Sequence, residues 1–88
     1  MPDQSAAHRA LDLIEQDAFQ PGPNWSAAHD IVQSREGIAL FDAIHALLHR
    51  IEGDTGNAAY WDRRAGTNFG THGLTEELAQ LRLLAEDT

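Results

Sequence analysis

The stretch from Ile38 to Glu52, IALFDAIHALLHRIE, carries the longest apolar run of the chain and most limits the folds open to it. A step of about 100° per residue along an α-helix places Phe41, Ile44 and Leu48 on one face. The opposite side carries small residues such as Ala43, which let a neighbouring helix approach closely. A helix that is apolar on one side and alanine-lined on the other packs on both sides, so the sequence predicts a central helix here.

Four further helical segments flank this central helix. Each has apolar residues at helical spacing, and proline or glycine separates one segment from the next. No segment shows the alternation of a strand, and no internal repeat is present. The sequence therefore predicts an all-α fold, a compact bundle of about five helices around a central helix 38–52, in a single domain over residues 1–88. The first flanking helix is capped by Ser5, has apolar positions as far as Ala18 and is stopped by Pro21-Gly22-Pro23. The other expected flanking helices are Asn24 or Ser26 to Gln33, Gly56 or Asn57 to Ala65, and a last helix capped by Thr75 with Glu76 and Glu77 in its first turn.

The charge balance excludes several classes of partner. The net charge is −8 and the chain has no lysine, which argues against nucleic acid and anionic membrane surfaces. No apolar run approaches the roughly 20 residues that span a bilayer, and the first residues, MPDQSAAHRA, lack the hydrophobic region of a signal peptide. The absence of cysteine removes thiol catalysis and cysteine-based zinc sites. These features predict a cytoplasmic protein.

One flank of the central helix is polar, and function is expected there. The spacings of three, four and three residues between its members place them along one side of the helix. His29, on the second helix, could face this flank across a helix pair. The flank consists of Asp42, His45, His49 and Glu52.

The first interpretation of this flank is a metal site. Two histidines four residues apart on a helix, His45 and His49, can share a divalent metal ion, and Glu52 one turn further on can complete the set. The HExxH signature of zinc hydrolases is absent, because Ala46 stands at the glutamate position. A hydrolase of that class is therefore not expected.

The second interpretation is structural, and clusters of this kind are most often structural. His45 and His49 would hydrogen-bond to carboxylates and backbone groups at a buried seam between helices. Arg64 would then form an ion pair with Glu52 or Asp42, because a buried charge persists in a folded protein only when it is paired.

The third interpretation is a small-molecule or acid–base site. Histidine titrates near neutral pH, and a histidine beside an aspartate or glutamate is the usual general-base arrangement. Tyr60 and Trp61 could line a pocket, and Arg64 could hold a carboxylate or phosphate group. No cysteine, and no serine in a recognisable nucleophile turn, accompanies the histidines.

The stretch IHALLHRIEGDTGNAAYWDRRAG, together with Trp25 to Gln33, resembles a family of small all-helical proteins with a HALLHRxEGD…NAxYWxRRAG core. The family pattern carries an aromatic residue where this chain has Asp62. The resemblance covers about the middle half of the chain and implies a helical fold. It implies no activity, because none is established for the family.

Together these observations predict a small cytosolic binding or protein-interaction module, and they do not favour an enzyme. A homodimer also fits, since a core of this size gains stability by burying a helix face against a second copy. The competing prediction is a metal- or small-molecule-binding helical enzyme that uses the cluster of histidines and carboxylates. Whether those side chains converge depends on how the second and central helices cross. The residues of that cluster are His29, His45, His49 and Glu52.

Overall fold

The computed structural model describes residues 4–86, and the fold is all-helical over this range. Five α-helices and one short 3₁₀ helix follow one another, which confirms the all-α prediction. Within the same range, no helix combines the length and the hydrophobicity needed to cross a membrane. The elements are α1 (Gln4–Gln16), α2 (Pro23–Gln33), α3 (Ala39–Ile51), α4 (Thr55–Ala65), η1 (Phe69–His72) and α5 (Leu74–Glu86).

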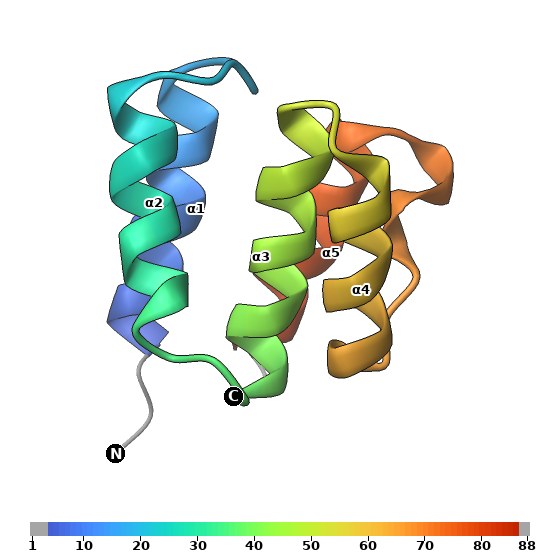
Figure 1. The fold of residues 1–88 in the computed structure, drawn as a ribbon. Helices are drawn as coiled ribbons and strands as arrows, with labels where there is room; N and C mark the ends of the chain where they lie inside the picture. Colours follow the sequence, from blue (N-terminus) through green and yellow to red (C-terminus); the bar gives the residue numbers. More distant parts are fainter. Residues whose placement is uncertain (1–3, 87–88) are drawn as a thin grey trace.

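The helices are arranged around α3 (Figure 1). α1 and α2 form an antiparallel hairpin on one side of α3, and α4 packs along its other side. α5 lies behind α3 and also contacts α1, so that it closes the bundle. α3 therefore touches each of the other four α-helices. The predicted central helix is confirmed, with Ile38 and Glu52 as the flanking cap residues of α3.

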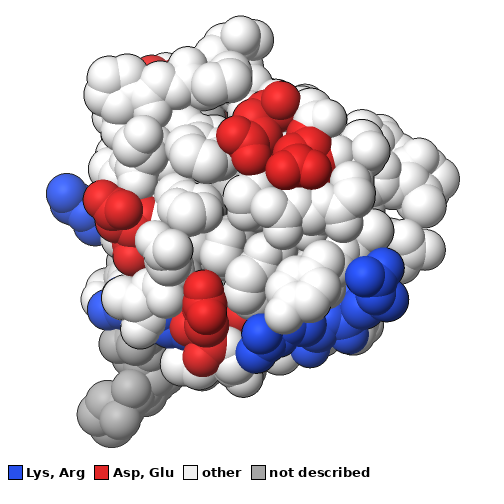
Figure 2. Space-filling view, viewed as in Figure 1, with Lys and Arg blue, Asp and Glu red and all other residues white. Residues whose placement is uncertain are grey.

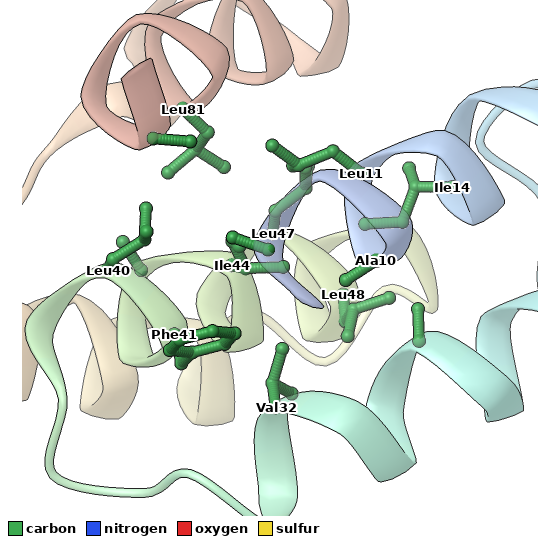
Figure 3. Packing of buried hydrophobic residues seen from close by; sticks show 14 of the residues in the cluster. Ala10, Leu11, Ile14, Val32, Leu40, Phe41, Ile44, Leu47, Leu48 and Leu81 are labelled. Carbon is green, nitrogen blue, oxygen red and sulfur yellow. The ribbon is translucent and has the colours of Figure 1, made fainter. Parts of the chain in front are cut away.

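The hydrophobic core forms where α1, α2 and α5 meet α3 (Figure 3). Leu11 of α1, Val32 of α2 and Leu81 of α5 are fully buried against apolar side chains of α3. On α3 itself, every residue from Leu40 to His49 is buried. Burial of a leucine-sized side chain contributes about 1.5–3 kcal/mol. The helix that carries the polar flank is thus also the main source of buried apolar surface.

The end of α1 differs from the predicted one. The helix stops at Gln16, before Ala18, which was expected to be its last apolar position. Ala18 and Phe19 have φ angles of 51° and 62°, in the left-handed region that non-glycine residues rarely occupy. The Phe19 N–H donates to the Ile14 carbonyl, and the Phe19 ring packs against the core. Packing of this ring explains why the chain leaves the helix early.

Three helix starts also differ from the predicted ones. α4 begins at Thr55 and not at Gly56 or Asn57. α2 begins at Pro23 and not at Asn24 or Ser26, because proline suits the first turn of a helix, where its missing N–H is not needed. α5 begins at Leu74, so Thr75 lies inside its first turn and does not cap it. These corrections move each start by one to three residues and leave the order of helices unchanged.

The connections on either side of α4 contain a helix cap and a short 3₁₀ helix. Asp54 caps α4, since its side chain accepts a hydrogen bond from the Asn57 N–H at 3.2 Å. A glycine-rich connection, residues 66–73, follows α4. It contains the short helix η1, which packs against α5.

An ion-pair network joins α3, α4 and α5. Arg50, near the end of α3, donates from Nε and Nη2 to the two carboxylate oxygens of Glu77, at 2.9 and 2.6 Å. Its Nη2 also lies 3.1 Å from a carboxylate oxygen of Asp62 on α4. Glu77 occupies the first turn of α5 as predicted, but it is only 1% exposed. The network therefore fixes α4 and α5 against the central helix.

Gly70 in η1 lies against the guanidinium group of this network. A Cβ atom added to Gly70 would come within 2.5 Å of Nε and Cζ of Arg50. Because Glu77 and Asp62 hold Arg50 in place, its side chain is not free to move away. We expect Gly70→Ala to lower the free energy of unfolding by about 1–3 kcal/mol, measured by urea denaturation.

Gly56→Ala provides the matched control for this prediction. Gly56 lies in the first turn of α4, and no atom lies within 4 Å of an added Cβ. Alanine is the better helix former, so we expect this variant to be neutral or more stable by up to about 1 kcal/mol. Equal losses in the two variants would show that contact with Arg50 is not the cause.

Candidate metal centre

Three imidazole rings meet at the seam between α2 and α3. His29 comes from α2, and His45 and His49 come from successive turns of α3. One ring nitrogen of each residue lies within 4.8 Å of a ring nitrogen of both others. The three residues therefore form a group that could hold a metal ion. We call it the three-histidine cluster.

Local structure explains why these rings converge. The spacing of four residues places His45 and His49 on the same side of α3, with ring centroids 4.9 Å apart and nearly parallel planes. α2 buries Ala28 and Val32 in the core. This packing brings the adjacent His29 against α3, where its ring centroid lies 4.7 Å from that of His45.

The spacing of two of the nitrogens matches that of metal ligands. Nε2 of His29 lies 3.1 Å from Nε2 of His45. A tetrahedral zinc ion with Zn–N bonds of about 2.0–2.1 Å separates its nitrogen ligands by about 3.3 Å. In the protein without metal the same two nitrogens form a hydrogen bond, in which one ring donates and the other accepts. Their positions need little adjustment to share an ion.

Glu52 orients the third ring. Its Oε2 lies 2.7 Å from Nδ1 of His49. Because a carboxylate accepts hydrogen bonds, this contact assigns a proton to Nδ1 and leaves Nε2 of the neutral ring as the ligand atom. Histidines that bind metals usually have such an outer partner. Glu52 is thus an outer partner of His49. Glu52, His49 and the exposed Asp54 also form a second group of potential ligands.

Two tryptophans flank the cluster. Trp25 stacks on His29 with ring centroids 5.0 Å apart, and Trp61 stacks on His45 at 4.0 Å. The indole N–H of Trp25 donates to the Leu48 carbonyl at 2.7 Å, which fixes the ring on α3. Trp25 was not among the candidate site residues predicted from the sequence. Its position four residues before His29 was the available signal, since that spacing brings two rings together on a helix.

Burial keeps two of the rings uncharged at neutral pH. Burial, together with the neighbouring His29 and His49, lowers the pKa of His45 from 6.5 to about 4. Burial and His49 also lower the pKa of His29, although nearby carboxylates such as Asp30 oppose this shift. A neutral imidazole is the form that binds a metal ion. The cluster therefore presents free nitrogen lone pairs at neutral pH.

One nitrogen of the cluster has no partner. Nδ1 of His45 is buried, and it neither donates nor accepts a hydrogen bond within residues 4–86. Leaving such a buried group unpaired costs about 1–3 kcal/mol. No partner fixes which nitrogen of this ring carries the proton, so Nε2 can present its lone pair. Local costs of this kind are typical of functional sites.

Asp42 does not join the cluster, although it shares the polar flank of α3. Its side chain is 2% exposed and accepts a hydrogen bond from the Gly37 N–H at 3.1 Å. Gly37 lies in the connection that leads from α2 into α3. Asp42 thus holds the entry to α3, and it is a structural residue.

Tyr60 and Arg64 lie on the outer side of Trp61. Arg64 donates to the Tyr60 hydroxyl at 3.1 Å, and its guanidinium carbon lies 5.0 Å from the centre of the Trp61 ring. The predicted ion pair of Arg64 with Glu52 or Asp42 is not formed within the described part of the chain. The arginine that closes the buried ion pair is Arg50, which reaches inward from the end of α3.

Charged side chains border the seam without filling it. Figure 2, in the same orientation as Figure 1, shows acidic side chains near the end of α3 and basic side chains near the end of α4. The surface between them is largely uncharged. The protein as a whole has a net charge of −8, which raises the local concentration of cations at such a surface.

No known protein family, curated protein or solved structure matches this chain. The resemblance based on the HALLHR and YWDRRAG stretches therefore stays a prediction. The interpretation of the three-histidine cluster rests on its own geometry and electrostatics.

Proposed function

We propose that this protein binds one divalent transition-metal ion through His29, His45 and His49. The observation that carries this proposal is the 3.1 Å separation of two Nε2 atoms from different helices, beside a third ring oriented by Glu52. The sequence predicted His45, His49 and Glu52 as the ligands. The geometry favours His29 in the place of Glu52, with Glu52 as the outer partner of His49.

The donor set determines which ions fit. Three neutral imidazoles suit zinc, copper, nickel and cobalt ions, whereas magnesium and calcium prefer oxygen ligands. The chain has no cysteine that could compete for the ion. The proposed cofactor is therefore a divalent transition-metal ion, such as zinc or copper, that is intermediate between hard and soft Lewis acids.

A structural role alone explains the cluster less well. A seam that only joins two helices gains nothing from a buried, unpartnered nitrogen at His45, or from burial that lowers the pKa of His45 and of His29. A shared ion uses the nitrogen lone pairs that the His29–His45 contact brings together. Because it would bind the folded state only, it would also raise the stability of the protein.

Titration of the tag-free, metal-depleted protein with Cu²⁺ tests this proposal. The chain has two tryptophans, and both stack on rings of the cluster, so the bound ion should quench the intrinsic fluorescence. We expect saturation at one equivalent. Loss of an outer partner of a ligand costs about 10–100-fold in affinity, so we expect Glu52→Gln to fall in that range and His29→Gln to lose at least as much.

His72→Gln provides the matched control, because His72 lies in η1 and is not part of the cluster. It should bind copper like the unmodified protein. Equal affinities in His29→Gln and the unmodified protein would contradict the three-histidine assignment. An Asp54→Asn variant that loses binding while His29→Gln retains it would instead place the ion at the exposed group of His49, Glu52 and Asp54.

The protein-interaction function and the homodimer expected from the sequence stay predictions. The large hydrophobic residues that are exposed lie on three separate parts of the chain, and single exposed apolar residues are ordinary on a protein surface. No patch of the described surface therefore singles out a partner. These residues are Ile38, Tyr60 and Leu83.

A further inference from the structure

The three-histidine cluster provides three ligands, whereas zinc-type ions take four in their usual tetrahedral geometry. Among the histidine, aspartate and glutamate side chains of residues 4–86, no fourth one offers an atom within the same 4.8 Å limit. Glu52 is already engaged on the far nitrogen of His49. An ion bound as proposed would keep one coordination position for a ligand from solution.

The charge of the ligand set favours an anion at that position. The three imidazoles contribute no negative charge, so a divalent ion would keep its full charge at a site where His45 is 2% and His49 7% exposed. Glu52 offsets this charge only indirectly, through the ring of His49. An uncompensated charge in a partly buried site is costly, and an anionic ligand would reduce that cost.

The walls of the cluster limit the size of such a ligand. Trp25 stacks on His29 and lies edge-to-face with His49, with ring centroids 6.2 Å apart. The hydrogen bond from its indole N–H to the Leu48 carbonyl holds it there. Trp61 covers the face of His45. The ligand must therefore approach beside His29, the only half-buried member of the cluster.

We propose that the metal-loaded protein binds a small carboxylate at this fourth position. This inference rests on the proposed metal binding. The carboxylate would coordinate the ion through one oxygen, and the remainder of a small ligand would lie toward solvent beside His29. The function that follows is recognition of a small organic acid by a metal-dependent binding module.

Cobalt-loaded protein tests this inference, because the visible absorption bands of Co²⁺ change with its ligands whereas zinc has no such bands. Acetate, the simplest carboxylate probe, would be added at constant pH and ionic strength. We expect a saturable change of the cobalt bands that fits one acetate per ion. His72→Gln, which lies outside the cluster, should respond to acetate in the same way as the unmodified protein.

The outcomes separate the two proposals. If the protein shows no cobalt bands, and His29→Gln is indistinguishable from the unmodified protein, the proposed metal site is wrong. If cobalt binds with loss of affinity in His29→Gln but acetate leaves the bands unchanged, only the carboxylate position is wrong. In that second case, cobalt bands altered by Asp30→Asn would identify Asp30 as the side chain that occupies the position.

Discussion

Replacing Arg50 with methionine is expected to lower the free energy of unfolding by about 3–5 kcal/mol, as removal of one partner from a buried ion pair does. The remaining Glu77 carboxylate is 1% exposed, and both of its oxygens depend on Arg50. Small domains have a total stability of only about 5–15 kcal/mol, so Arg50→Met should leave the protein barely folded. Urea denaturation followed by circular dichroism at neutral pH measures the effect.

The reciprocal variant provides the control for this prediction. Glu77→Leu removes the buried carboxylate and leaves Arg50 with Asp62, a partner at 3.1 Å, and with a side chain that is 21% exposed. We therefore expect Glu77→Leu to cost less than Arg50→Met. The double variant should recover part of the loss, because replacing both charges with apolar side chains leaves no buried charge unpaired. A loss below about 1 kcal/mol for Arg50→Met would mean that water solvates Glu77.

The central helix could be predicted from the sequence because its signals are local. Apolar residues such as Phe41, Ile44 and Leu48 repeat at helical spacing, and Gly53 follows where the helix must stop. The end of α1 and the start of α5 were harder to predict, because tertiary packing decides where these helices stop and begin. Phe19, for example, leaves the helix to reach the core, and no residue beside it signals this.

The same distinction between local signals and tertiary packing applies to the three-histidine cluster. The pairing of His45 with His49 follows from their spacing on one helix, and His29 could be expected to face them only in general terms. The distance of 3.1 Å depends on how α2 packs against α3, which no local pattern encodes. Glu52 could be predicted near His49, but its role as an outer partner depends on a third residue from another helix.

The buried ion-pair network could not be predicted, because its members lie far apart in the sequence. Arg50 and Glu77 are 27 residues apart, and Glu77 reads as an ordinary acidic residue in the first turn of a helix. Asp62 of α4 also contacts Arg50 and accepts a hydrogen bond from Thr67, and neither contact follows from a local sequence pattern.

Acidification of the metal-free protein is expected to remove about 2 kcal/mol of stability by pH 5 and about 3 kcal/mol by pH 4 through His45 alone. The pKa of His45 is lowered from 6.5 to about 4 in the folded protein. Between these values the unfolded chain binds a proton that the folded protein does not, so acid favours unfolding. The contribution is therefore complete above pH 6.5 and is lost as the pH falls toward 4. The lowered pKa of His29 acts in the same direction.

His45→Phe distinguishes this explanation from general acid denaturation. The ring centroids of His45 and Trp61 are 4.0 Å apart. Phenylalanine keeps an aromatic ring against Trp61 and has no group to protonate. It also removes the unpartnered Nδ1, so the variant should be at least as stable as the unmodified protein at pH 7 in the presence of a chelator. Urea denaturation from pH 7 to pH 4 should then give a flatter dependence on pH for His45→Phe. An unchanged slope would mean that groups outside the cluster cause the acid sensitivity. If His45→Phe is more stable than the unmodified protein without metal but no longer binds metal, then His45 is needed for metal binding and destabilises the metal-free fold.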